Sequence, residues 1–157
     1  MIIAVTGWRD HTDEAFIHGA MEEVFDTHGF HSSSHEDFLV RVGDAAGADE
    51  IVKDWCAANG INFDVYVARR YPSGALMPGA GPERNRRLLT YAQHIRLPSR
   101  TITLRPELAH LLVGFPEPGQ RIRIPGSGSW GCISTAFTLR IPVIIPGVPT
   151  ERTAHGS

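Results

Sequence analysis

The chain has 157 residues, 42% hydrophobic and 20% charged, which is typical of one soluble globular domain that can bury a core of its own. Two cysteines are too few for a disulfide framework, and the apolar runs are too short for a leader peptide or a membrane span, so we expect a cytoplasmic protein with no membrane contact. Residues 1–80 carry 13 acidic and five basic side chains and residues 81–157 carry four and ten, which indicates either an anionic ligand or charged partner for the second half or merely a solvated surface.

The first half of the chain alternates apolar runs with amphipathic stripes. Residues 2–7 predict a buried strand, and a helix follows whose stripe runs from Phe16 to Phe25, with Thr12 as the expected cap. A polar loop then leads to a second strand at 38–43. The next helix begins near Ala48 and is expected to end at Gly60, before a third strand at 62–68.

The second half continues this alternation with interruptions. A Gly/Pro-rich loop at 69–80 precedes a helix over 81–93, which opens with Pro82. A fourth strand is expected at 108–115, a helix after the glycine-rich turn within 126–140, and a fifth strand at 141–146. Residues 96–107 and 116–126 break the rhythm, and Arg121 and Arg123 alternate with isoleucines as in a small hairpin or flap.

Strands that alternate with helices predict an α/β fold. We expect a single Rossmann-like domain over residues 1–148, with a mainly parallel sheet of about five strands and helices on both faces. Residues 149–157 form a polar tail that is expected to be disordered. Cys56 and Cys132 are expected to be buried thiols.

Ligands of parallel α/β sheets bind outside the carboxyl ends of the strands. Four segments should meet there, each leading into a helix N-terminus that favours anions: "TGWRD", "GDAAGAD", "GPERN" and "GSGSWG". The small residues Gly43 and Gly47 let a ligand or a neighbouring loop approach the backbone. No P-loop is present, and the G-x-G-x-x-G spacing at 126, 128 and 131 neither ends a strand directly nor precedes a suitably placed acid, so no cofactor is expected.

The candidate ligand-binding residues share this position at the strand ends: Gly7, Arg9, Asp10, Gly43, Asp44, Gly47, Arg84, Asn85, Gly128, Ser129, Gly131 and Thr135. Arg84 is the residue we expect to contact phosphate, because a guanidinium matches phosphate bidentately; the alternative is a solvated helix face shared with Arg86 and Arg87. Arg9 and Asp10 either hold the ligand or pair with each other. Asp49 either satisfies free N–H groups of its own helix or binds ribose hydroxyls.

Other patterns carry weaker expectations. His28, His31 and His35 lie in a polar segment that no predicted strand or helix holds together, so no metal site is expected. The aromatic side chains Trp8, Tyr71 and Trp130 either stack on a base or pack internally. The arginines of the second half favour nucleic acid, but a pI near 6.4 and the absence of a nucleic-acid motif argue against DNA binding.

The quoted segments, with "GPERNRRLL" and "FPEPG…GSGSWGCISTAFTLRIPV", resemble the YpsA-related SLOG family in their order and spacing over most of residues 1–147. The resemblance implies a Rossmann-like fold and a nucleotide or nucleotide-derived ligand. Relatives in that family include the Lonely Guy phosphoribohydrolases, which cleave the N-glycosidic bond of nucleoside monophosphates, and the DNA-processing protein DprA. Members are common in bacteria and phages, and a homo-oligomer is a further expectation.

The chain departs from the phosphoribohydrolase pattern P-G-G-x-G-T-x-x-E, because its turn reads "GSGSWGCISTA" and contains no glutamate. We therefore expect a module that senses or sequesters a phosphorylated nucleotide-derived molecule. The alternative is an N-glycosidic hydrolase that uses Asp44, Asp49 or Glu83 as its acid. A DNA-binding protein of the DprA kind is the third possibility.

Overall fold

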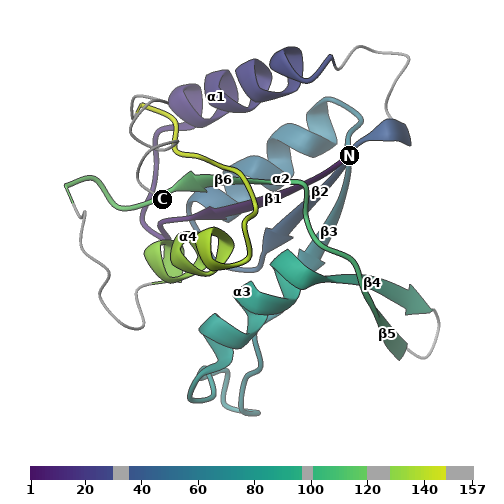
Figure 1. Cartoon of the computed structure of the whole chain (residues 1–157). Helices are drawn as coiled ribbons and strands as arrows, with labels where there is room; N and C mark the ends of the chain where they lie inside the picture. Colours follow the sequence, from purple (N-terminus) through teal and green to yellow (C-terminus); the bar gives the residue numbers. More distant parts are fainter. Residues whose placement is uncertain (30–35, 97–100, 120–127, 148–157) are drawn as a thin grey trace.

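A computed structural model describes residues 1–29, 36–96, 101–119 and 128–147. Five parallel strands form the main sheet in the order β3-β2-β1-β6-β7 (Figure 1). The strands are β1 (Ile2–Gly7), β2 (Leu39–Gly43), β3 (Asn62–Tyr66), β6 (Leu111–Phe115) and β7 (Val143–Ile144). In this register Val5 lies beside Val42 on one side and Val113 on the other. The predicted Rossmann-like α/β fold is confirmed.

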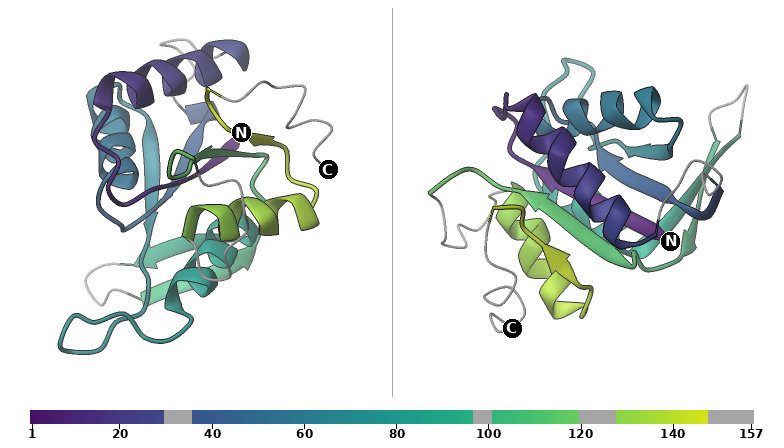
Figure 2. Two further views of the ribbon diagram at one scale, coloured as in Figure 1. Left: turned by 90° about the vertical axis from the view of Figure 1, so that its left-hand side faces the viewer. Right: turned by 90° about the horizontal axis from the view of Figure 1, so that it is seen from above.

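Helices cover both faces of the sheet (Figures 1 and 2). One face packs against α1 (Glu14–Thr27) and α2 (Ala48–Ala58) and the other against α3 (Ala80–Thr90) and α4 (Gly128–Thr138). Within the described residues no helix combines the length and the apolar character needed to cross a bilayer. Each helix begins close to the carboxyl end of a strand, which places four helix N-termini along one edge of the sheet.

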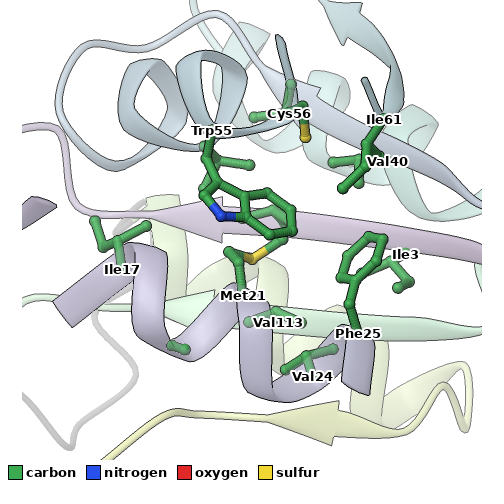
Figure 3. Close-up of a cluster of buried hydrophobic side chains, with 14 of the residues drawn as sticks. Ile3, Ile17, Met21, Val24, Phe25, Val40, Trp55, Cys56, Ile61 and Val113 are labelled. Atoms are coloured by element: carbon green, nitrogen blue, oxygen red, sulfur yellow. The ribbon is translucent and has the colours of Figure 1, made fainter. Parts of the chain in front are cut away.

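The α1–α2 face holds a dry core that follows directly from the helical spacing (Figure 3). The buried face of α1 carries Ile17, Met21 and Phe25, at most 1% exposed. The ring of Phe25 lies 5.2 Å from those of both Phe38 and Trp55. Apolar residues that recur with a period of 3.6 form one face of a helix, and that face packs against the core. This half of the fold is therefore predictable from sequence.

The connection between α3 and β6 differs from the prediction. The helix expected over 81–93 ends at Thr90. β4 (Tyr91–Arg96) begins within that expected helix and forms an antiparallel hairpin with β5 (Thr101–Pro106), which lies in the interruption expected at 96–107. The hairpin projects beside the main sheet (Figure 1). Its base is anchored by Tyr66, whose hydroxyl donates to the Tyr91 carbonyl at 2.7 Å, and by the Gln93 amide, which donates to Val65. These contacts favour extended backbone over another helical turn.

A buried arginine adds a third anchor to this hairpin. Arg41 in β2 is 0% exposed and donates to the main-chain carbonyl of Glu107 at 2.8 Å and to its carboxylate at 3.3 Å. Burial lowers the pKa of Arg41, and the nearby tyrosine and carboxylates oppose this. The arginine therefore ties β2 to the segment that follows β5.

The helix termini give one correction and one confirmation. Asp13 caps α1 in place of Thr12, since its carboxylate accepts the Phe16 N–H at 3.1 Å. Gly60 follows the end of α2 at φ +66°, as predicted. The expected flap around Arg121 and Arg123, the tail 149–157, and His31 and His35 lie outside the described residues.

Candidate functional site

A cavity of about 1050 Å³ opens at the carboxyl edge of the sheet. All four segments that the sequence placed there contribute to its wall. The contributing candidates are Gly7, Arg9, Asp10, Gly43, Asp44, Asp49, Arg84, Asn85, Gly128 and Ser129. A fifth segment, the loop between β3 and α3, adds Arg70 and residues 74–77, which sequence reasoning did not select.

Three predicted ligand-binding residues and one candidate acid lie elsewhere. Gly47 borders a second hollow of about 420 Å³ beside the start of α1. Gly131, Thr135 and Glu83 are not among the residues that line the large cavity. The Thr135 hydroxyl donates to the Gly131 carbonyl at 3.0 Å, so it is engaged within its own helix.

Gly43 and Gly47 are small because parts of the protein itself approach them. A Cβ at Gly47, whose φ is +72°, would lie 2.3 Å from the carbonyl oxygen of Arg9. A Cβ at Gly43 would lie 2.7 Å from Asp49 Oδ2 and 2.8 Å from Arg84 Nη1. Of the two expected occupants, ligand or neighbouring loop, the loop therefore fills the space at Gly47, while side chains of the site fill the space at Gly43.

Arg84 is the centre of a charged network that joins three elements. Its Nη1 donates to Asp44 Oδ1 at 2.6 Å, and its Nε donates to Asn85 Oδ1 at 2.9 Å. The Asn85 amide in turn donates to the Gly128 carbonyl at 3.0 Å, and the N–H of Ala68 donates to the same Asp44 oxygen. The Arg84 side chain is only 12% exposed, so it is not part of a solvated face, and Asp44 already compensates its charge. A phosphate contact at Arg84 stays a prediction.

The neighbouring arginines of α3 have a different role. Arg87 forms a two-pronged ion pair with Glu83 at 2.7 and 3.0 Å and also donates to the Val67 carbonyl. The hydrogen bond from Arg87 lowers the pKa of Glu83. Glu83 is therefore an ionised structural partner of α3 rather than an acid directed at the cavity.

Asp49 is the most unusual side chain of the site. It is 3% exposed, and its Oδ2 accepts the N–H of Ala45 at 3.2 Å. Its Oδ1 has no hydrogen-bond partner among the described residues. Burial raises the pKa of this carboxyl to about 7, although the charge of Arg84 works in the opposite direction. The expected capping of its own helix is not found, because Ala45 precedes α2.

Two arginines on the cavity carry no carboxylate partner among the described residues, Arg9 and Arg70. Arg9 and Asp10 line the cavity without forming the ion pair with each other that the sequence left open. Arg70 donates through Nη1 to the Gly74 carbonyl at 2.9 Å, which holds the guanidinium across its own loop. The available signal was its position at the start of a Gly/Pro-rich loop that follows a predicted strand.

The loop that carries Arg70, between β3 and α3, extends away from the sheet (Figure 2) and is held by main-chain hydrogen bonds. Tyr71 donates its N–H to Ala75 at 2.8 Å and Met77 donates to Arg69 at 3.0 Å. Leu76 and Met77 line the cavity, as do Trp8 and Trp130 from the opposite segments, whereas Tyr71 is not part of its wall. The cavity thus combines charged groups with apolar and aromatic surface.

The part of the chain that the structure describes contains no group of three metal-ligating side chains. The thiols of Cys56 and Cys132 are buried, and this burial raises both pKa values to about 12. Neither is a reactive thiolate at neutral pH.

Comparison with family models, curated proteins and solved structures returns no match to this chain.

Proposed function

We propose that the chain is a SLOG-type module that binds a phosphorylated, nucleotide-derived small molecule in the cavity at the carboxyl edge of the sheet. The observation that carries the proposal is the convergence of four strand-end segments on one cavity of about 1050 Å³. The cavity lies where the strand order reverses, since Gly7 ends β1 and Glu117 follows β6. This is the usual position of ligands in open α/β sheets.

Two arginines of the cavity are available to an anionic group, although the acidic residues Asp10 and Glu117 also line the wall. Arg84 is compensated by Asp44, but Arg9 and Arg70 are not paired with any carboxylate of the described residues. The N-termini of α3 and α4 also face the cavity, through Ala80 and Gly128, and helix N-termini attract anions. Arg70 and Arg9 are therefore the residues that we assign to the phosphate.

The remaining wall suits a base. Trp8, Leu76, Met77 and Trp130 give apolar and aromatic surface on two sides of the same space. Aromatic faces stack on any base, and a cavity of this size accommodates a mononucleotide. Phosphate at the arginines and base against the apolar wall together describe a nucleotide.

The first test identifies what the purified protein carries. The protein is denatured and the released small molecules are measured by mass spectrometry, and nucleoside monophosphates, NAD and cyclic nucleotides are then tested for binding by calorimetry. We expect a phosphorylated compound to be released or one of this panel to bind. A protein that releases nothing and binds none of these compounds contradicts the proposal.

A pair of adjacent arginines gives a matched control. Arg70→Gln should weaken the best mononucleotide by about tenfold to a hundredfold, since hydrogen bonds to charged groups contribute about 1.5–3 kcal/mol, and should leave the unphosphorylated nucleoside unaffected. Arg69→Gln changes the same charge on the same loop but outside the cavity, and should leave both affinities unchanged. Equal losses in the two variants would mean that only the general positive charge matters.

One observation favours a second candidate, N-glycosidic hydrolysis. The carboxyl of Asp49 lines the cavity with its pKa raised to about 7, which suits a general acid at neutral pH. The other candidates are engaged, Asp44 by Arg84 and Glu83 by Arg87. Chromatography of nucleoside monophosphates after incubation separates the two functions: multiple-turnover release of free base that is lost in Asp49→Asn indicates the hydrolase, and recovery of intact ligand indicates the binding module.

A further inference from the structure

The wall of the cavity contains hydrogen-bonding atoms that the fold does not satisfy. Four buried side-chain nitrogen or oxygen atoms of the described residues lack a partner, and two of them belong to residues that line the cavity, Asp49 Oδ1 and Trp130 Nε1. Buried polar groups are nearly always hydrogen-bonded, so each exception calls for a reason. The clearest exception is Asp49, which is 3% exposed.

Asp49 has no structural task that uses its second oxygen. It makes no ion pair within 4.0 Å among the described residues, and its one hydrogen bond, from Ala45, uses Oδ2. Its neighbour Asp44 shows the contrast, because a single Asp44 oxygen receives both Arg84 and the N–H of Ala68. A side chain kept for stability would be arranged like Asp44.

The surrounding sequence makes room for Asp49 at this place. Gly43 lacks the Cβ that would lie 2.7 Å from Asp49 Oδ2, and Arg84 lies against the same glycine. The charge of Arg84 opposes the effect of burial on the pKa of Asp49, although Arg84 forms no ion pair with this carboxylate within 4.0 Å. The site therefore holds a buried acceptor, in a residue that lines the cavity, for which the described residues offer no donor.

We propose that Asp49 Oδ1 accepts a hydrogen bond from an uncharged donor of the bound molecule, a hydroxyl or an amino group, and that this end of the ligand lies deep in the cavity with its phosphate outward at Arg9 and Arg70. The inference rests on the proposed function and adds the orientation of the ligand. A phosphate beside Asp49 would meet two carboxylates, Asp44 and Asp49, and a single guanidinium that Asp44 already compensates. Repulsion between like charges disfavours that orientation.

Two parts of a nucleotide supply such a donor, the sugar hydroxyls and an exocyclic amino group of the base. The probes are adenosine 5′-monophosphate, its 2′,3′-dideoxy analogue, and inosine 5′-monophosphate, which lacks the amino group. One of the two analogues should bind the wild type about tenfold more weakly than adenosine monophosphate, the size of one lost hydrogen bond to a charged acceptor. The same analogue and adenosine monophosphate should bind Asp49→Asn equally, which identifies the group that Asp49 contacts.

A measurement of thermal stability without ligand tests the role of Asp49 independently of the choice of nucleotide. Asn retains an oxygen for the Ala45 N–H but removes the buried charge, so Asp49→Asn should have a Tm at pH 8 at least as high as that of the wild type. The matched control Asp44→Asn weakens the pair with Arg84 and should lower the Tm. These two Tm results would support a role for Asp49 in binding and not in stability.

A Tm of Asp49→Asn clearly below that of the wild type at pH 8 overturns the inference, because Asp49 would then be structural. Unchanged affinity for adenosine monophosphate in that variant overturns it as well. If none of the three probes binds the wild type, adenosine and inosine nucleotides are excluded as ligands under the proposed function, and the stability comparison alone decides the role of Asp49.

Discussion

The core beneath α1–α2 and the carboxyl edge of the sheet treat buried side chains in opposite ways. Between the sheet and α1–α2, Ile17, Met21 and Phe25 lie in a closed apolar cluster. At the carboxyl edge, Asp44, Asp49 and Arg84 are largely removed from solvent around a cavity. The first region contributes stability through apolar burial, and the second tolerates a buried carboxyl whose second oxygen has no partner among the described residues.

This difference separates residues that hold the fold from residues that are available to a ligand. Substitutions in the α1–α2 core should lower the free energy of unfolding and leave binding by the folded protein unchanged. Substitutions at the unpartnered groups of the cavity should weaken binding and leave the free energy of unfolding unchanged or higher, since residues of functional sites are often not optimal for stability. Each of the following changes tests one side of this contrast.

The largest loss is expected in the core. Phe25→Ala removes a ring that is 1% exposed and contacts Phe38 and Trp55, and should lower the free energy of unfolding by about 3–5 kcal/mol. Urea denaturation followed by tryptophan fluorescence measures it. Phe16→Ala in the same helix is the control, since Phe16 is 40% exposed and should lose clearly less. Equal losses would show that this core is not closed.

The pH dependence should reveal the buried carboxyl of Asp49. Its pKa of about 7 lies above the value of about 3.9 in an unfolded chain, so the stability that its protonated form contributes is present below pH 4 and is lost as pH rises to about 7. The slope is at most about 1.4 kcal/mol per pH unit. Of the nearby charged groups, Arg84 and Lys53 lower this pKa and Asp44 raises it.

Denaturation of the wild type and Asp49→Asn at a series of pH values between 4 and 8 measures this effect. The difference between them should grow in favour of Asn as pH rises, and it should level off above pH 7. A difference that does not change with pH would mean that Asp49 is ionised throughout and carries an ordinary pKa.

A smaller effect is expected where the loops at the strand ends meet. Gly47→Ala places a Cβ 2.3 Å from the Arg9 carbonyl at a φ of +72°, and should lower the free energy of unfolding by about 1–3 kcal/mol. It should also weaken mononucleotide binding, because Arg9 must move. Gly19→Ala on the exposed side of α1 meets nothing within 4 Å and should stabilise by about 0.5–1 kcal/mol. Thermal denaturation of both variants tests the contrast.

The fold was predictable because its signals are local. Apolar runs at 2–7 and 38–43 and the helical stripe that contains Phe25 identify strands and helices without reference to the rest of the chain. The hairpin of β4 and β5 was missed because its strands contain few apolar residues and follow α3 without a breaker. Its anchors, such as Arg41 on Glu107, join residues 66 positions apart.

The location of the site was predictable, but the state of its side chains was not. The rule that ligands lie at the carboxyl ends of strands placed Gly43, Asp44 and Arg84 on one cavity. The pairing of Arg84 with Asp44 spans 40 positions and depends on how α3 packs against β2. The burial of Asp49 likewise depends on the absence of a side chain at Gly43. From the sequence alone, an acid at this position is predicted to cap its own helix.

The most direct test of the central claim is an amide NMR titration with adenosine 5′-monophosphate, or with any better ligand that the panel reveals. Binding in the cavity predicts the largest shifts at Gly43–Asp49, at Arg70–Met77 and at Gly128–Trp130, three segments that only the fold brings together. The β4–β5 hairpin, which contributes nothing to the cavity wall, should not respond. Shifts confined to that hairpin, or none anywhere with every compound of the panel, would contradict a nucleotide site at the carboxyl edge of the sheet.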